Sequence, residues 1–284
     1  MTSRMIPNPP EPARDDAILP VTRVLAAGVI PFLLAAFLIL YIRPQTTARL
    51  FAWEIGSPLT AALMGAGYLG GACFFGRLLG ERRWHRVGGG FPAVAVFTLF
   101  MLATTLLHWD AFDPTHWPFL VWLVIYLVTP IAVLWVWRLN RRRDPGRPEP
   151  GDVVVPPVAC RVVLIAGVAL LLMAVFIFIV PQSAVAVWPW PQTPLTARVM
   201  AGWLALLGTG ALTLSFERRW SGWRIPLQSI IVWQTLLALA FALRSEAFGP
   251  AGPLNWFTLF TITGLTVAVG FHVLMERRRR NIEA

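Results

Sequence analysis

The stretch Val162–Val180, VVLIAGVALLLMAVFIFIV, runs for 19 residues without a single charged side chain. An α-helix rises about 1.5 Å per residue and the hydrocarbon core of a bilayer is about 30 Å thick, so about 20 apolar residues cross it. A strand of a membrane barrel would instead alternate apolar and polar residues over about ten positions. The stretch therefore predicts a transmembrane helix.

Seven further runs without Asp, Glu or Arg lie on either side of this stretch. The whole chain of 284 residues is 57% hydrophobic and only 13% charged, whereas a soluble domain carries about 25% charged residues. This composition excludes a disordered protein and an ordinary cytosolic enzyme, and we expect an all-α integral membrane protein with eight transmembrane helices. The seven runs are Val24–Ile42, Pro58–Gly76, Phe91–Leu107, Pro118–Trp137, Val199–Phe216, Ile225–Leu243 and Trp256–Met275.

The basic residues divide unequally between the two ends of these runs. All 24 are arginine, and when the N-terminal tail and alternate loops are assigned to one side, the other side holds only Arg43, Arg49, Arg198 and Arg244. Loops rich in arginine stay in the cytoplasm, so both termini are predicted to be cytoplasmic. The compact loops favour a bacterial cytoplasmic (inner) membrane. Because the net charge of +10 is interrupted by apolar segments, no nucleic-acid partner is expected.

Short motifs recur at a nearly constant offset. The tetrapeptide PLTA at Pro58–Ala61 returns 136 residues later at Pro194–Ala197, and ERRW at Glu81–Trp84 returns at Glu217–Trp220 with the same offset. Each half then holds four helices, and this even number means that both halves enter the membrane in the same direction. We expect two parallel four-helix repeats, related by a pseudo-twofold axis along the membrane normal.

The repeats and the loop composition define the domain organisation. Residues 1–20 are predicted to be a disordered cytoplasmic N-tail, and residues 21–139 the first four-helix membrane repeat. Residues 140–157 contain five prolines and are predicted to be an extended cytoplasmic linker. Residues 158–280 form the second four-helix repeat, and residues 281–284 form the C-tail.

Local signals mark helix starts and a close helix contact. Ser57-Pro58 and Thr193-Pro194 each place a capping hydroxyl before a proline, which predicts that a helix begins there. Small residues on the second run indicate tight packing against another helix. They are Ala62, Ala66, Gly67, Gly70 and Gly71.

The sequence contains little that indicates catalysis. None of the eight runs contains Asp, Glu or Arg, which disfavours proton-coupled carriers and voltage sensors. Phosphate loops, zinc-protease and nucleophile-elbow motifs are absent. Cys73 and Cys160 have no histidine or cysteine at metal-ligand spacing, and His108 and His272 fall near opposite faces, which disfavours haem. We therefore predict no catalytic residue, no metal, no cofactor and no enzyme activity.

Acidic, aromatic and basic residues gather in the loops predicted on the outer face. They could converge on a polar ligand or a lipid headgroup, although a solvated loop with interfacial tryptophans is the simpler interpretation. This outer-face cluster consists of His108, Trp109, Asp110, Asp113, Arg244, Glu246 and Trp256.

Polar side chains inside the last two runs form a second candidate set. Such groups hydrogen-bond between helices or line a polar cavity. The set consists of Gln228, Gln234, Thr235, Thr258 and Thr261.

Three functions fit these features. The first is a binding or transport module for a neutral, apolar or lipid-like ligand between the halves. The second is a non-catalytic membrane subunit or scaffold, and the third, ranked last, is a lipid- or isoprenoid-modifying enzyme. A wide aqueous or polar cavity between the halves would favour the first function, and a flat, apolar lateral surface with close-packed halves the second. Carboxylates and His108 within hydrogen-bond reach over a lipid-sized groove would favour the third. Beyond the lipid bilayer, a membrane-protein partner or a homo-oligomer stays open.

The orientation is tested with single cysteines in a chain whose Cys73 and Cys160 are replaced by serine. A membrane-impermeant thiol reagent added to intact cells should label Asp113→Cys and miss Gly146→Cys, because arginine keeps the second loop in the cytoplasm. After the cells are permeabilised, both variants should be labelled. The reverse pattern in intact cells would contradict the topology.

Overall fold

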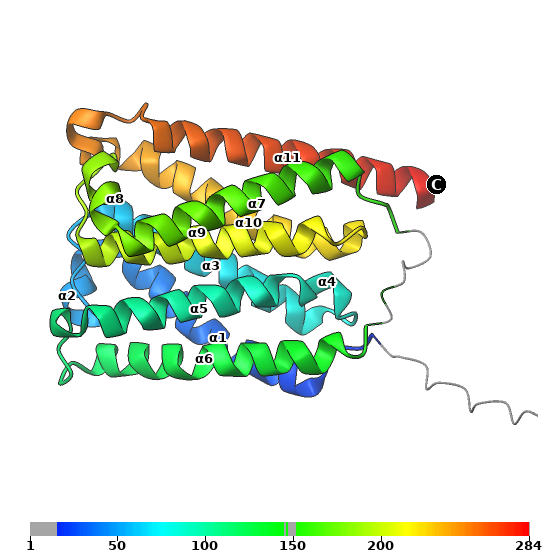
Figure 1. The fold of residues 1–284 in the computed structure, drawn as a ribbon, viewed down its shortest axis with the longest axis horizontal. Coiled ribbons are helices and arrows are strands. Elements are labelled where there is room, and N and C mark those ends of the chain that lie inside the picture. The colour runs from blue at the N-terminus through cyan, green and yellow to red at the C-terminus, as the bar shows by residue number, and fades with distance from the viewer. Residues whose placement is uncertain (1–15, 145, 147–151, 284) are drawn as a thin grey trace, which may run out of the picture.

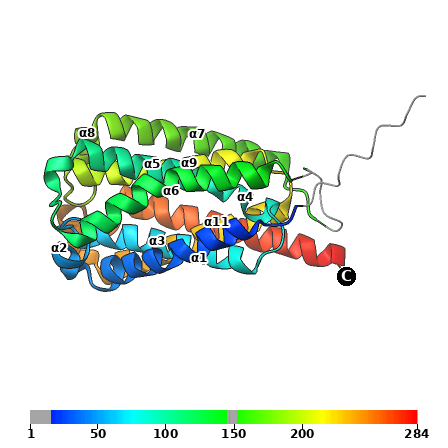
Figure 2. The ribbon, with the colours of Figure 1, turned by 90° about the horizontal axis from the view of Figure 1, so that it is seen from below.

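The computed structural model describes residues 16–144, 146 and 152–283, and these residues form an elongated bundle of long helices (Figure 1 and Figure 2). Within this described part of the chain, eight helices are long and apolar enough to cross a membrane, as predicted. They are α1 (Pro20–Phe37) with its π-helical extension (Leu38–Ile42), α3 (Pro58–Gly80), α5 (Gly90–Leu107) with the short α4 (His85–Gly88) before it, α6 (Trp117–Arg141), α7 (Pro157–Ile179), α9 (Pro194–Ser215), α10 (Trp220–Leu243) and α11 (Trp256–Glu283).

Short elements connect the long helices. Figure 1 shows α2 and α8 at one end of the bundle and α4 with the end of α11 at the other. The second end carries most of the arginines, and we call it the arginine-rich end. The short elements are the 3-10 turns Pro44–Thr46, Trp109–Ala111 and Ser245–Ala251 and the helices α2 (Thr47–Leu50) and α8 (Pro181–Val187).

The predicted capping residues begin α3 and α9. Ser57 accepts a hydrogen bond at Oγ from the backbone N–H of Thr60, at 3.4 Å. Thr193 Oγ1 accepts from the N–H of Thr196 at 3.2 Å, and Thr196 Oγ1 accepts from the N–H of Thr193 at 2.8 Å. These bonds satisfy backbone groups that have no partner inside the helix.

Two of the main helix contacts join distant parts of the chain. Helix α3 packs on α10 and α5 packs on α9, whereas α9 and α10 touch only slightly although they are consecutive. Outside these pairs, α1 packs on α3 and α7 on α9, and α6 packs on α5 and α11 on α10. The four central helices α3, α5, α9 and α10 thus carry an outer helix each.

Small residues allow these helices to approach closely. A Cβ atom on Gly70 of α3 would lie 2.9 Å from the carbonyl oxygen of Ser229 in α10, and one on Gly65 would lie 2.8 Å from Tyr41. Ala62 and Ala66 are completely buried. The prediction of tight packing on this helix is therefore confirmed, and the partners are α1 and α10.

The segments before α1 and α7 pack against loops at the arginine-rich end. Ala17 forms a β-bridge with Arg83, and Val154 forms one with Arg219. Asp16 and Ile18, at the end of the predicted N-tail, also form backbone hydrogen bonds with Trp84 and Arg82 of the loop after α3; residues 1–15 of the tail lie outside the described residues. Likewise, Val155, near the end of the predicted linker, donates to the Arg218 carbonyl in the loop after α9; linker residues 145 and 147–151 lie outside the described residues.

Substitution of Gly167 by alanine tests the contact between α7 and α9. Its Cβ would lie 2.9 Å from the backbone nitrogen of Leu212 and 3.0 Å from the carbonyl oxygen of Gly208, so we expect Gly167→Ala to destabilise the protein by about 1–3 kcal/mol through overpacking. The matched control is Gly28→Ala, because a Cβ on Gly28 meets nothing within 4 Å. Thermal unfolding in one detergent should show a lower midpoint for Gly167→Ala alone, and equal midpoints would contradict the packing.

Candidate functional site

A cavity of about 360 Å³ lies among helices of both halves. Its wall includes residues of the four central helices α3, α5, α9 and α10, together with residues of α7 and α11. Glycines open this space, because Gly67, Gly71 and Gly210 line it without side chains. A Cβ on Gly67 would lie 2.5 Å from the Trp203 ring, so glycine at this position allows the indole to stand between α3 and α9.

The cavity wall is almost entirely apolar. Leucine, isoleucine, valine, phenylalanine, alanine and glycine make up most of it, and the described lining residues include no Asp, Glu, Arg or His. Its polar side-chain atoms belong to Ser229, Gln234 and three tryptophans. Ser229 donates to the Ile225 carbonyl, Trp223 to that of Glu217 and Trp233 to that of Leu63. Of the remaining atoms, Trp203 Nε1 and Gln234 Oε1 are buried without a hydrogen-bond partner among the described residues.

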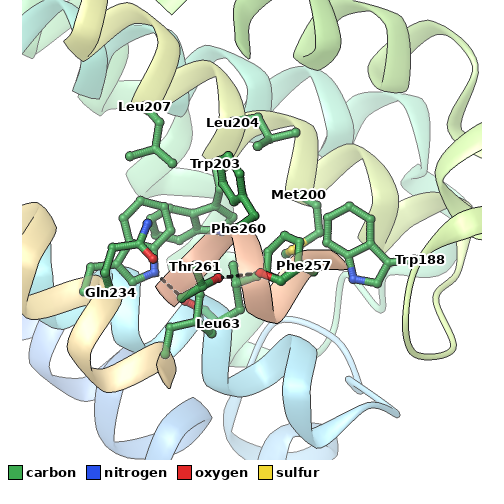
Figure 3. A pocket seen from close by; sticks show the side chains of 12 residues that line it. Leu63, Trp188, Met200, Trp203, Leu204, Leu207, Gln234, Phe257, Phe260 and Thr261 are labelled. Atoms are coloured by element: carbon green, nitrogen blue, oxygen red, sulfur yellow. Dashed lines mark hydrogen bonds between the residues drawn. The ribbon is translucent and has the colours of Figure 1, made fainter. Parts of the chain in front are cut away.

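A second, water-sized pocket of about 30 Å³ adjoins the cavity (Figure 3). The two spaces share five lining residues, so they lie side by side; these are Trp203, Leu207, Trp233, Gln234 and Phe260. The small pocket extends the space toward Trp188, Met200 and Phe257. The two unpartnered polar groups therefore lie where the large cavity meets the small pocket.

The predicted polar residues of the last two runs separate into different surroundings. Gln234 and Thr261 line the small pocket, where Thr261 donates to the Phe257 carbonyl at 2.9 Å. Gln228 accepts a bond from Arg77 at 2.9 Å and contacts His272 Nε2 at 3.0 Å. Thr235 is exposed on the outside of α10. The set as a whole does not line one space.

Thr258 lies at the start of α11. Its backbone N–H donates to Oδ1 of Asn255 at 3.1 Å, and its hydroxyl lies 3.5 Å from the same atom. Asn255 also accepts from the N–H of Phe257. Thr258 thus belongs to the hydrogen bonds that begin the helix.

Members of the outer-face cluster bind partners outside the cluster. His108 Nε2 accepts from Arg198 at 2.7 Å, and burial, helped by this guanidinium, lowers the pKa of the His108 ring. Arg244 donates to the Tyr41 carbonyl, and Trp256 donates to that of Val187 at 3.1 Å.

The other members lie near the surface. Asp113 accepts from Thr115, the Trp109 ring packs edge-on against Phe119, and Asp110 and Glu246 are exposed. Among the described residues, no hydrogen bond or ion pair joins two cluster members, and a shared ligand on this face stays a prediction.

A polar chain that the sequence reasoning missed crosses between the halves at the arginine-rich end. Asp16 accepts from the backbone N–H and from Nδ1 of His85, and Asp152 accepts from the N–H and from the hydroxyl of Ser221. His85 Nε2 and Ser221 Oγ are 3.0 Å apart. The hydrogen-bonded side chains follow the order Asp16, His85, Ser221, Asp152. Asp16 lies before α1, and Asp152 lies before α7.

A sequence signal for this chain existed in the 136-residue offset. That offset relates Asp16 to Asp152 and His85 to Ser221. His85 alone gives no such signal, because it lies among Arg82, Arg83 and Arg86.

The order Asp, His, Ser is that of a hydrolase triad, but the protons are arranged differently. In a triad the serine hydroxyl donates to the histidine, which accepts its proton. Here the Ser221 hydroxyl donates to a second carboxylate, Asp152, and lies 3.0 Å from His85 Nε2. The four side chains form a hydrogen-bonded bridge between the two halves.

No family model, curated protein or solved structure matches this chain. The candidate site is accordingly defined by its own geometry: an apolar cavity, an adjoining pocket whose wall holds unpartnered polar atoms, and a polar bridge at one end of the bundle.

A double-mutant cycle tests the bridge. If the His85–Ser221 hydrogen bond couples the halves, His85→Gln and Ser221→Ala together should cost less than the sum of the single costs, with a coupling of roughly 1–2 kcal/mol. The measurement is the free energy of unfolding in mixed micelles. His85→Gln with the distant Ser183→Ala is the control pair and should be additive. Additivity of the first pair within about 0.5 kcal/mol would contradict the bridge.

Proposed function

We propose that the chain is a multi-pass protein of a bacterial cytoplasmic membrane with both termini in the cytoplasm. Eight helices of suitable length and the arginines at one end of the bundle support this proposal. The outer helices also expose apolar side chains: Val24, Ile131 and Ile165 are each at least 70% exposed. Such side chains on α1, α6 and α7 are stable in contact with lipid tails.

The paired contacts support the proposal of two parallel repeats. Helix α1 packs on α3 as α7 packs on α9, and α5 on α6 as α10 on α11. In this comparison α3 corresponds to α9, and α5 corresponds to α10. The contact of α3 with α10 therefore corresponds to the contact of α9 with α5, and these are the two main contacts between the halves. The β-bridges Ala17–Arg83 and Val154–Arg219 correspond as well. A pseudo-twofold axis would run between the four central helices, where the cavity lies.

Within this frame, the protein acts as a binding or transport module for a neutral, apolar or lipid-like molecule. The observation that carries this proposal is the cavity of about 360 Å³, whose size falls in the range of small-molecule sites, about 300–1,000 Å³. Its wall offers no described charged group, and burying a charged ligand without a partner is very unfavourable. The cavity is apolar, not aqueous or polar, which favours a lipid-like ligand over a hydrated one.

The other two functions have less support. Exposed apolar faces would suit a scaffold with a membrane-protein partner or a homo-oligomer, but contact with lipid explains them equally. For a lipid-modifying enzyme the outer-face carboxylates should reach His108, whereas its hydrogen bond in the structure is to Arg198. The absence of enzyme activity stays a prediction.

Filling the cavity tests the proposed function. Gly264 and Gly270 both lie on α11, and a Cβ on either meets nothing within 4 Å, but only Gly264 lines the cavity. Native mass spectrometry of protein released gently from its membrane should show a retained neutral molecule in the wild type and in Gly270→Phe. In Gly264→Phe the retained fraction should fall by about tenfold, because the ring occupies the space. Equal retention in both variants, or none in the wild type, would contradict the proposal.

A further inference from the structure

Two polar atoms remain unpartnered where the cavity meets the small pocket. Gln234 is 8% exposed and Trp203 is 4% exposed, and both line the two spaces. Gln234 Oε1 is a hydrogen-bond acceptor and Trp203 Nε1 is a donor, and neither has a partner among the described residues. Figure 3 shows both side chains in the wall of the pocket.

These atoms contrast with two polar groups beside them. Trp233, beside Gln234 in the sequence, donates to the Leu63 carbonyl at 3.2 Å, and Thr261 donates to that of Phe257 at 2.9 Å. A buried polar atom without a partner costs about 1–3 kcal/mol. The packing therefore satisfies Trp233 and Thr261, whereas Gln234 Oε1 and Trp203 Nε1 have no partner among the described residues, and the same holds for Trp188 Nε1 in the wall of the small pocket.

The missing group must both donate and accept, and it must be small. An ether or a ketone only accepts, so it would leave Gln234 Oε1 unpaired, whereas a hydroxyl can accept from Trp203 and donate to Gln234. The small pocket of about 30 Å³ holds a water-sized group. Neither space offers a described cation for a carboxylate or a phosphate.

We propose that Gln234 and Trp203 bind the hydroxyl of a neutral, long-chain alcohol whose apolar chain fills the larger cavity. This inference rests on the proposed function and names the ligand's polar group. Both residues lie well inside their helices, Gln234 in α10 and Trp203 in α9, so the hydroxyl is buried far from either end. A hydroxyl at this depth in hydrocarbon lacks water, and the two side chains replace it.

Competition between two matched probes tests the proposal. The wild-type protein in phosphatidylcholine nanodiscs is cross-linked with a dodecanol that carries a mid-chain diazirine, and either 1-dodecanol or dodecyl methyl ether competes. The two competitors have the same chain, but only the alcohol can donate to Gln234. We expect the alcohol to displace the probe at about one-tenth of the ether concentration, the ratio that one hydrogen bond provides.

Variants identify the groups responsible. Gln234→Leu should abolish the preference for the alcohol, and Trp203→Phe should weaken binding of both competitors because each can accept from the indole. Thr266→Val is the control: Thr266 is exposed, bonds to the Ile262 carbonyl and lines neither space, so the tenfold preference should persist. Because Gln234→Leu removes an unpartnered polar atom, its melting temperature without ligand should equal or exceed that of the wild type.

The outcomes separate the two proposals. If alcohol and ether compete equally on the wild type, the cavity binds chains but the hydroxyl site is overturned. A lower melting temperature for Gln234→Leu with an unchanged alcohol preference would also overturn it, since the amide would then serve packing or hold a water. If neither competitor displaces the probe, the proposed function itself fails.

Discussion

Helices α3 and α10, and helices α5 and α9, form the contacts on which the rest of the structure depends. Each pair joins a helix of one half to a helix of the other, whereas consecutive α9 and α10 touch only slightly. Closeness is possible because glycines such as Gly70 let backbone approach backbone. Where glycines such as Gly67 and Gly210 face side chains of another helix and not its backbone, they line the cavity. The glycines of the central helices thus explain both the close helix packing and the cavity.

Polar groups are few along the helices, and they differ in whether they have a hydrogen-bond partner. Inside a membrane an unsatisfied polar atom has no water to bind, so most are paired, as Tyr68 is with Tyr126 at 2.9 Å. At the arginine-rich end, the chain from Asp16 to Asp152 bridges the halves. Gln234 Oε1 and Trp203 Nε1, which line the cavity, have no partner among the described residues. Their position in the cavity wall distinguishes these proposed binding groups from the bridge.

The sequence predicted the helices well, because hydrocarbon thickness and local caps act on each segment alone. Val162–Val180 lies almost wholly within α7, and Ser57 and Thr193 cap α3 and α9 as expected. Which helix packs on which was not predictable, since apolar faces look alike when lipid is the alternative contact. For the same reason Gln234 could not be separated from Gln228, and His85 became notable only once Ser221 lay beside it.

The pairing of helices across the halves can be measured directly through Ala93 of α5 and Gly210 of α9. A Cβ on Gly210 would lie 3.6 Å from that of Ala93, within the range of disulfides, about 3.5–4.5 Å. Ala93→Cys and Gly210→Cys are combined in a chain without Cys73 and Cys160, with a protease site inserted at Gly146. After oxidation and cleavage, a non-reducing gel should show one full-length band, and two half-length bands would contradict the pairing.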